Sequence, residues 1–221
     1  FIRSLRYFQP MIKNAELQAD VRGFIGQEAH HGYEHDALNT LMTHAGMPTQ
    51  SIEVLVKNFL DWYARHISPE RQLAKTVALE HFTAMFGEMI LLHPEILEGA
   101  HPQVKQLWLW HALEEVEHKS VAFDVYKEQV DNEWIRLSEM IVNTFTFLGF
   151  YSIHYFQLSH QINDKTDWHS IYHGWQWLLG KKNGILTKIG KHYLEFYNKD
   201  FHPDQRNTEN LVEQWRQKLS L

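Results

Sequence analysis

The chain of 221 residues contains no cysteine, and this absence removes several kinds of chemistry at once. Disulfide bridges, thiolate metal sites and a cysteine nucleophile are all excluded. Positive charge is also scarce, because the formal net charge is −6 and no cluster of Lys and Arg occurs. The chain therefore lacks the charged surface by which proteins hold nucleic acid, and we expect no nucleic-acid partner.

Long hydrophobic runs are rare as well. Residues 140–156 are nearly all apolar, but Asn143 and His154 interrupt them, and a membrane-spanning helix needs about 20 apolar residues. We expect this segment to form a buried helix or one that lines a substrate channel. A hydrophobic surface that faces a membrane near the site is the alternative interpretation.

The apolar residues that are present recur with helical spacing almost throughout, and no alternating strand pattern of useful length appears. The sequence therefore predicts an all-α protein. Without an internal repeat or a low-complexity linker, residues 1–221 form one predicted domain, and because the chain begins at Phe1 we expect a missing N-terminal segment. The predicted helices are 1–9, 15–45, 51–66, 69–92, 102–130, 133–161, 167–179, 185–197 and 208–219.

The most informative motif is the run from His111 to His118, H-A-L-E-E-V-E-H. On a helix, His111, Glu115 and His118 stand at positions i, i+4 and i+7 and project from one face. Another predicted helix carries Glu28 and His31, three residues apart. Two Glu-x-x-His pairs on separate helices are typical of a dinuclear metal site inside a four-helix bundle.

A Glu-x-x-His pair alone is weak, because 18 Glu and 16 His in this chain give roughly one pair by chance. A third pair, Glu98 and His101, cannot lie on one helix, since Gly99 separates them and Pro102 follows. A solvated, charge-rich helical face is the alternative interpretation of the other two pairs. Apolar neighbours of the triplet argue against that alternative, namely Trp108, Trp110, Leu113, Val116, Ala122 and Phe123.

A site of this type needs further carboxylates, and Glu80 is the best candidate, on an otherwise apolar helical face. An ordinary exposed glutamate is the alternative, and Glu88 is a poorer candidate for the ligand. His81 points about 100° away from Glu80, so we expect a supporting or structural role for it. Because Glu16 shares a helix with Glu28, the site remains one carboxylate short. Either that carboxylate lies upstream of Phe1 or the extra histidines replace it.

Extra histidines distinguish this site from a symmetrical one. His111 precedes Glu115 by one turn, and His35 follows His31 by one turn. Each is expected to be either a ligand or a group that orients a ligand. We expect three neighbouring glutamates to be solvated or ion-paired, namely Glu34, Glu114 and Glu117.

At these residues the chain resembles a bacterial family of predicted metal-dependent hydrolases with a ferritin-like helical core. The resemblance covers most of the chain, in the stretches F-I-R-S-L-R at 1–6, F-I-G-Q-E-A-H-H-G-Y-E-H at 24–35, A-L-E-H-F-T-A at 78–84, W-H-A-L-E-E-V-E-H-K-S-V-A-F-D-V-Y at 110–126 and F-H-P at 201–203. It implies a ferritin-like four-helix bundle with additional C-terminal helices. It also implies a Gly-Glu directly before Phe1, which would supply the absent carboxylate. On one helix the triplet resembles the di-iron N-oxygenases that oxidise arylamines, and this implies that His111 is an iron ligand.

Three functions fit these observations. The first is an oxidoreductase that activates O₂ at two ions, iron first and Mn or Zn as alternatives, on a hydrophobic small molecule. The second is a metal-dependent hydrolase with a metal-activated water. The third is a non-enzymatic metal- or lipid-binding protein. We expect a cytoplasmic protein with possible peripheral membrane contact, and we include a homodimer among the expected partners. The predicted metal ligands are Glu28, His31, Glu80, His111, Glu115 and His118, with His35 and His81 as candidate supporting residues.

Overall fold

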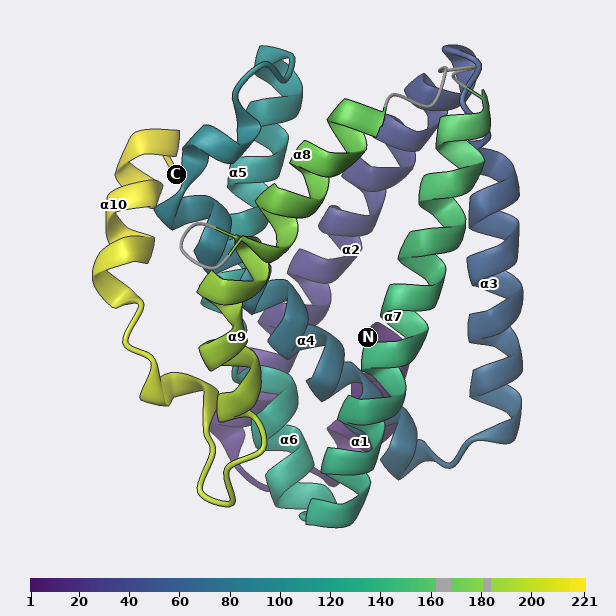
Figure 1. Cartoon of the computed structure of the whole chain (residues 1–221). Coiled ribbons are helices and arrows are strands. Elements are labelled where there is room, and N and C mark those ends of the chain that lie inside the picture. Colours follow the sequence, from purple (N-terminus) through teal and green to yellow (C-terminus); the bar gives the residue numbers. More distant parts are fainter. Residues whose placement is uncertain (162–167, 181–183) are drawn as a thin grey trace.

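A computed structural model describes residues 1–161, 168–180 and 184–221 of the chain (Figure 1). Within these ranges every regular element is a helix, so the predicted all-α class is confirmed. The ferritin-like arrangement stays a prediction. Short 3₁₀ turns lie at Gln9–Met11, Pro94–Leu97 and Pro203–Gln205. The α-helices are α1 Ile2–Phe8, α2 Ala15–His44, α3 Thr49–His66, α4 Pro69–Leu92, α5 Pro102–Glu117, α6 Val121–Gln129, α7 Glu133–Gln161, α8 Trp168–Leu179, α9 Ile185–Glu195 and α10 Glu209–Leu219.

Helix α4 is the central element of the fold. It begins with Pro69 directly after Ser68, where the missing N–H of proline costs nothing, and contacts α1, α3, α5, α6, α7 and α9. Most of its buried residues are small or apolar, and Leu73, Ala74 and Ala78 have no exposed surface. Gly87 allows α5 to come close, because a Cβ at this position would lie 2.7 Å from Ala112 O. The α4–α5 pair is therefore held at close range.

The sequence predicted one helix over residues 102–130, and this prediction is wrong. The structure ends α5 at Glu117 and restarts the chain as α6 at Val121. The break turns α6 back against α2 and α4, so that Val125 and Tyr126 become fully buried. At the break, Lys119 Nζ donates to Arg206 O at 2.7 Å. These tertiary contacts outweigh the local preference for a continuous helix.

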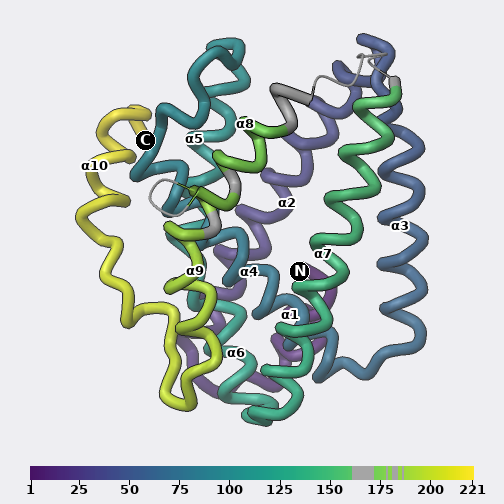
Figure 2. The backbone as a smooth tube through the Cα atoms, in the orientation of Figure 1, coloured from purple at the N-terminus to yellow at the C-terminus, as the bar shows by residue number. Residues whose placement is uncertain are grey.

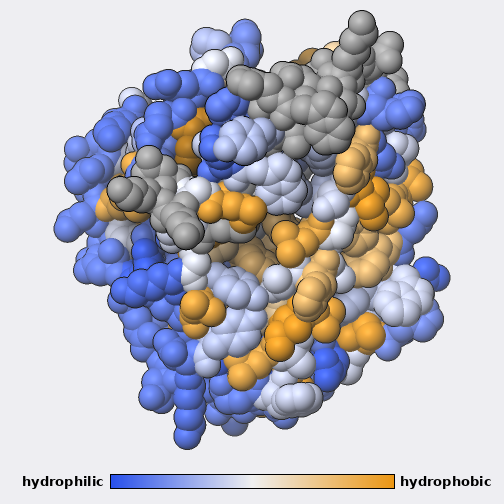
Figure 3. All heavy atoms as spheres, in the orientation of Figure 1, coloured by the Kyte–Doolittle hydropathy of each residue, from blue (hydrophilic) through white to orange (hydrophobic). Residues whose placement is uncertain are grey.

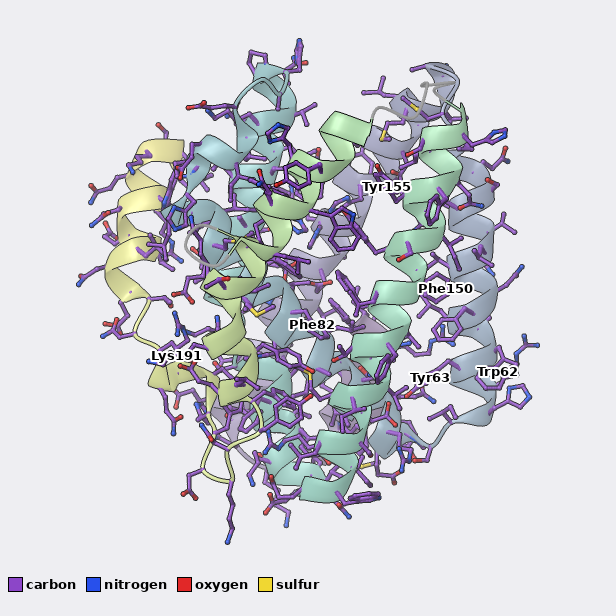
Figure 4. The ribbon with its side chains drawn as sticks, viewed as in Figure 1. Trp62, Tyr63, Phe82, Phe150, Tyr155 and Lys191 are labelled. Atoms are coloured by element: carbon purple, nitrogen blue, oxygen red, sulfur yellow. The ribbon has the colours of Figure 1, made fainter. Side chains whose placement is uncertain are left out.

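Helix α7 differs from the expectation of a buried or channel-lining segment. Its inner face does pack, since Asn143 is 2% exposed and the Phe147 ring stacks on Phe82 of α4 with centroids 5.5 Å apart. Toward α3, Phe150 contacts Phe59 with centroids 5.0 Å apart, and Figure 4 shows Phe150 and Phe82 on α7 and α4. The outward face is exposed, with Phe145 at 72%. The described helices cover one side of α7 only, so that expectation is wrong for its outward face.

Apolar residues gather on the surface formed by α7 and the neighbouring α3, which Figure 3 shows in orange. Within the described ranges, no helix combines the length and the apolar content that crossing a membrane requires. An exposed apolar surface of this extent calls for a partner that covers it.

The C-terminal helices close the other side of the molecule. Figure 2 shows the backbone leaving the lower end of α9 and returning along the outside to α10, beside α5. Trp215 of α10 is buried there, and its indole N–H donates to Leu91 O at 3.1 Å. Arg206 donates to Glu88 at 2.6 Å, which fixes the connecting segment to α4. The start of the predicted helix 167–179 at residue 167 lies outside the described residues.

Candidate metal centre

Three helices bring the predicted ligands together. Glu28, His31 and His35 stand three and four residues apart on α2, so they share one face of that helix. Helix α4 contributes Glu80. His111 and Glu115 lie one turn apart on α5, and His118 is the residue that caps the end of this helix.

Each of two glutamates lies between two histidines. Glu28 Oε1 is 3.7 Å from His31 Nδ1 and 3.6 Å from His118 Nε2. Glu115 Oε1 is 3.6 Å from His31 Nδ1 and 3.7 Å from His111 Nε2. These distances are longer than those of hydrogen bonds. They are short enough for two atoms that bind the same ion.

The atoms that face this space have no other partner within the part of the chain that the structure describes. They are buried and make no hydrogen bond, namely Glu28 Oε1, His31 Nδ1, Glu80 Oε1, both Glu115 carboxylate oxygens and His118 Nε2. Buried polar groups are nearly always paired, because an unpaired one costs about 1–3 kcal/mol. A metal ion binds to several lone pairs that converge on one point. The unpaired oxygen and nitrogen atoms of these residues therefore fit a bound metal ion.

Glu80 lies at the other nitrogen of His118. The carboxylate accepts a hydrogen bond from His118 Nδ1 at 3.1 Å, which directs His118 Nε2 toward Glu28. Ligand atoms of Glu28, Glu115 and His118 all lie within 4.8 Å of one another, and Glu80 is outside this group. The predicted ligand role of Glu80 stays a prediction, and its contact is that of a residue that orients a ligand.

A second group consists of His31, His35 and His111, whose ligand atoms also lie within 4.8 Å of one another. His35 Nε2 is 3.2 Å from His111 Nδ1, and the rings of His31 and His111 meet edge to face at 4.1 Å. The contacts of His35 fit either of its two predicted roles, a metal ligand or a group that orients His111.

Burial controls the protonation of the centre. Burial raises the pKa values of Glu80 and Glu115, and it lowers the pKa of His111 to about 3, so that His111 is neutral. Burial also acts to lower the pKa of His118, but the hydrogen bond and charge of Glu80 outweigh it and raise this pKa to about 9. Without an ion, a proton on His118 partly balances the carboxylates.

His81 lies away from the centre, and Glu114 differs from its predicted exposure. His81 Nε2 is 3.1 Å from His192 O, and its ring packs on His192 and Phe196, so its contacts are with α9 and fit the structural alternative. Glu114, expected to be solvated or ion-paired, is buried, its Oε2 has no partner among the described residues, and burial raises its pKa to about 7. That expectation is wrong, because Glu114 is buried close enough to the centre for His31 and His118 to act on its pKa.

The other glutamates singled out in the sequence lie closer to what the sequence predicted. Glu117 is ion-paired with Arg216, with atoms 2.7 Å apart, as expected. Glu98 and His101 flank Gly99, whose φ is +84°, and do not share a helix, as expected. Glu34 lines a surface cavity of about 260 Å³ beside α5.

This cavity lies next to the histidine group. Trp110 forms part of its wall and contacts the His31 ring with centroids 6.3 Å apart. The rest of the wall is half apolar, from Leu107, Leu219 and Leu221, and half polar, from His30, Gln103 and Gln106. On the inner side, the Phe24 ring meets the His118 ring edge to face at 4.8 Å. Aromatic side chains thus pack against histidines of the centre, and the cavity beside Trp110 lies close to it.

Together, the fold and this site define a helical protein whose core brings together carboxylate and imidazole groups that could hold a metal ion. A family model described as "Predicted metal-dependent hydrolase" matches residues 1–207. The chain therefore belongs to this family of predicted metal-dependent hydrolases. No curated protein and no solved structure matches the chain.

Proposed function

We propose that the protein is a metal-dependent hydrolase that acts on a small hydrophobic substrate at the centre formed by Glu28, Glu115 and His118. The observation that carries this proposal is the convergence of buried oxygen and nitrogen atoms that have no other partner. A bound ion would lower the pKa of a coordinated water to near neutrality and so make it a nucleophile.

The side chains of this centre have separable roles in the proposal. Glu28 and Glu115 would hold the ion with carboxylate oxygens, and His118 would add a nitrogen ligand through Nε2. Glu80 keeps the His118 ring in place by accepting the hydrogen bond from Nδ1. Phe24 keeps bulk water away from the same ring. The predicted carboxylate upstream of Phe1 would add a further oxygen ligand.

The proposed substrate is small and apolar at one end. The cavity beside Trp110 is smaller than the 300–1,000 Å³ that is usual for drug-sized ligands. Its apolar wall of Leu107, Trp110 and Leu219 suits a short acyl or aryl group, while His30 and Glu34 offer hydrogen bonds at the rim. An ester or amide with a short hydrophobic acyl chain fits these dimensions.

A second candidate function, an O₂-activating di-iron oxidoreductase, is favoured by one contact. The His111 ring turns toward the centre, with Nε2 3.7 Å from Glu115 Oε1. This is the orientation that an additional nitrogen ligand requires, and a nitrogen- and oxygen-rich set suits iron. The two functions differ in the ion that must be present and in the reaction that follows.

The test is metal analysis of protein purified without a metal-affinity tag, followed by two assays. Turnover of short-chain esters with Zn²⁺ or Mn²⁺, lost in Glu115→Gln and kept in His101→Ala, supports the hydrolase. Optical changes of an iron-loaded sample on reduction and O₂ exposure, without ester turnover, support the oxidoreductase instead. Bound metal without either activity would overturn both proposals and leave the non-enzymatic alternative.

A further inference from the structure

We propose that the second histidine group, His31, His35 and His111, is a separate nitrogen-only metal pocket for an ion of the Zn²⁺ class. Beside it, the carboxylate pocket of Glu28, Glu115 and His118 takes a harder ion such as Mn²⁺ or Fe²⁺. The centre would then be asymmetric, with two unlike ions. This inference deepens the proposed function and rests on it for the carboxylate pocket only.

The spacing of the histidine nitrogens supports a shared ion. His35 Nε2 and His111 Nδ1 lie 3.2 Å apart. Zn–N bonds of about 2.0–2.1 Å at tetrahedral angles place two ligand nitrogens roughly 3.3 Å apart, so this separation fits two corners of one coordination sphere. His31 is the third proposed ligand, because its ligand atom lies within 4.8 Å of the other two.

The two nitrogens of His111 face different pockets. Nδ1 faces His35, whereas Nε2 faces Glu115 Oε1 at 3.7 Å. When Nδ1 binds an ion, Nε2 carries the proton and directs it toward the Glu115 carboxylate. A carboxylate behind a metal-binding imidazole is the arrangement that fixes the tautomer and raises the basicity of the ligand.

The ligand atoms of the two pockets predict different ions. Three imidazole ligands suit Zn²⁺, Cu²⁺ or Ni²⁺, whereas carboxylate-rich sets suit Mn²⁺ and similar ions. Trp108 and Trp110 pack edge-on against rings of the histidine pocket, with His111 at 5.2 Å from Trp108. This apolar surround disfavours additional oxygen ligands from water.

The experiment measures metal binding rather than turnover. The chelator-treated full chain is dialysed against Zn²⁺ and Mn²⁺ together, and both metals are counted by mass spectrometry. The wild type should hold one equivalent of each. His35→Ala should lose the zinc and keep the manganese, while Glu28→Gln should do the opposite. His44→Ala, on the same helix but outside the pocket and exposed, should hold both.

A spectroscopic measurement separates a ligand from an orienting residue. With one equivalent of Cu²⁺, nitrogen couplings in the electron paramagnetic resonance spectrum should indicate three imidazoles, and two in His35→Gln. Retention of three couplings in this variant, or a zinc equivalent that His35→Ala leaves in place, would overturn the nitrogen pocket. This result does not depend on ester turnover. If His35→Ala loses zinc as expected but the wild type hydrolyses no ester, the proposed function is refuted and the nitrogen pocket stands.

A different observation, the exposed face of α7, carries a second inference. We infer that this face packs against α7 of a second copy of the chain. The α7 face consists of eight side chains that are each 46–72% exposed, namely Ile141, Val142, Phe145, Leu148, Tyr151, Ile153, Tyr155 and Phe156. Figure 4 shows Tyr155 on this helix, and Figure 3 shows the surface.

The area and charge of the α7 face fit a second copy. From these exposed fractions, the face offers on the order of 900 Å², close to the ~800 Å² per partner of a standard interface. Residues 140–161 contain no Lys, Arg, Asp or Glu, so two α7 faces can meet without charge repulsion. These residues also offer no cation that would attract an anionic lipid surface. A two-fold axis lets the same face serve both partners.

Sedimentation velocity of the full chain over a range of concentrations tests this interface. The wild type should be a dimer, and Phe145→Asp with Leu148→Asp should yield folded monomers. Tyr33→Asp changes a side chain that is 69% exposed on α2 and should leave the dimer intact. A monomeric wild type, or one that binds phosphatidylglycerol vesicles through the α7 face, would overturn the inference.

Discussion

Replacing Glu115 with methionine should change stability in opposite directions with and without metal. The Glu115 side chain is 1% exposed, burial raises its pKa, and neither carboxylate oxygen accepts a hydrogen bond within the described chain. The nearby Thr83 hydroxyl donates to Glu80 O instead. Without an ion, ionised Glu115 is therefore a buried charge with incomplete compensation.

The size of the effect follows from the burial of this group. A buried polar group without a partner costs about 1–3 kcal/mol, and methionine has a similar shape without this cost. In metal-free protein, Glu115→Met should raise the free energy of unfolding by about 2 kcal/mol, or the Tm by roughly 4–8 °C. An ion at a hundredfold excess over Kd stabilises the wild type by about 2.7 kcal/mol, which the variant cannot gain.

Thermal denaturation followed by circular dichroism, in EDTA and then in excess Zn²⁺ and Mn²⁺, measures this reversal. The variant should melt above the wild type in EDTA and below it with metal. Glu117→Met removes the ion pair with Arg216 and should cause a shift of less than about 1 kcal/mol, the same in both conditions. A variant that melts below the wild type in EDTA would refute the reasoning, because Glu115 would then be a structural group.

Three further predictions follow from single positions. Gly87→Ala places a Cβ 2.7 Å from Ala112 O, so it should force α4 from α5, cost about 1–3 kcal/mol and weaken metal binding, as chemical denaturation and metal titration will measure. His118→Ala should abolish metal loading in dialysis, whereas His101→Ala should leave it unchanged; equal loss would show that the site is misassigned. Burial lowers the pKa of Lys75 to about 8, so between pH 8 and 10.5 the unfolded chain holds a proton that the folded chain has released. The stability of the wild type relative to Lys75→Met, measured in EDTA, should therefore rise across this interval, and a flat difference would contradict the prediction.

The helical spacing of chemically distinctive residues could be predicted from the sequence. Glu28 with His31, and His111 with Glu115 and His118, needed only the rule that positions three or four apart share a helical face. Glu80 could be placed because its neighbours are apolar, and the structure buries it to 1% exposed. The motif thus locates the centre before any packing is known.

Contacts between distant elements could not be predicted in this way. At the break between α5 and α6, Lys119 donates a hydrogen bond to Arg206, which lies 87 residues later in the chain. The burial of Glu114 and the exposure of Phe145 depend on which helices cover each face. Periodicity shows that a helix has an apolar side but not which element lies on it, and residues 140–156 are apolar on every side. The position of His81 against α9 has the same origin.

The most direct test of the central claim is anomalous X-ray diffraction from crystals of the protein grown with Zn²⁺ and Mn²⁺. The account predicts an anomalous peak within bonding distance of Glu28, Glu115 and His118, and a second peak at the His31, His35 and His111 group. Data collected on either side of each metal's absorption edge identify the ion. Ordered crystals with no anomalous density at these side chains, at saturating metal, would contradict the claim that this buried cluster is a metal centre.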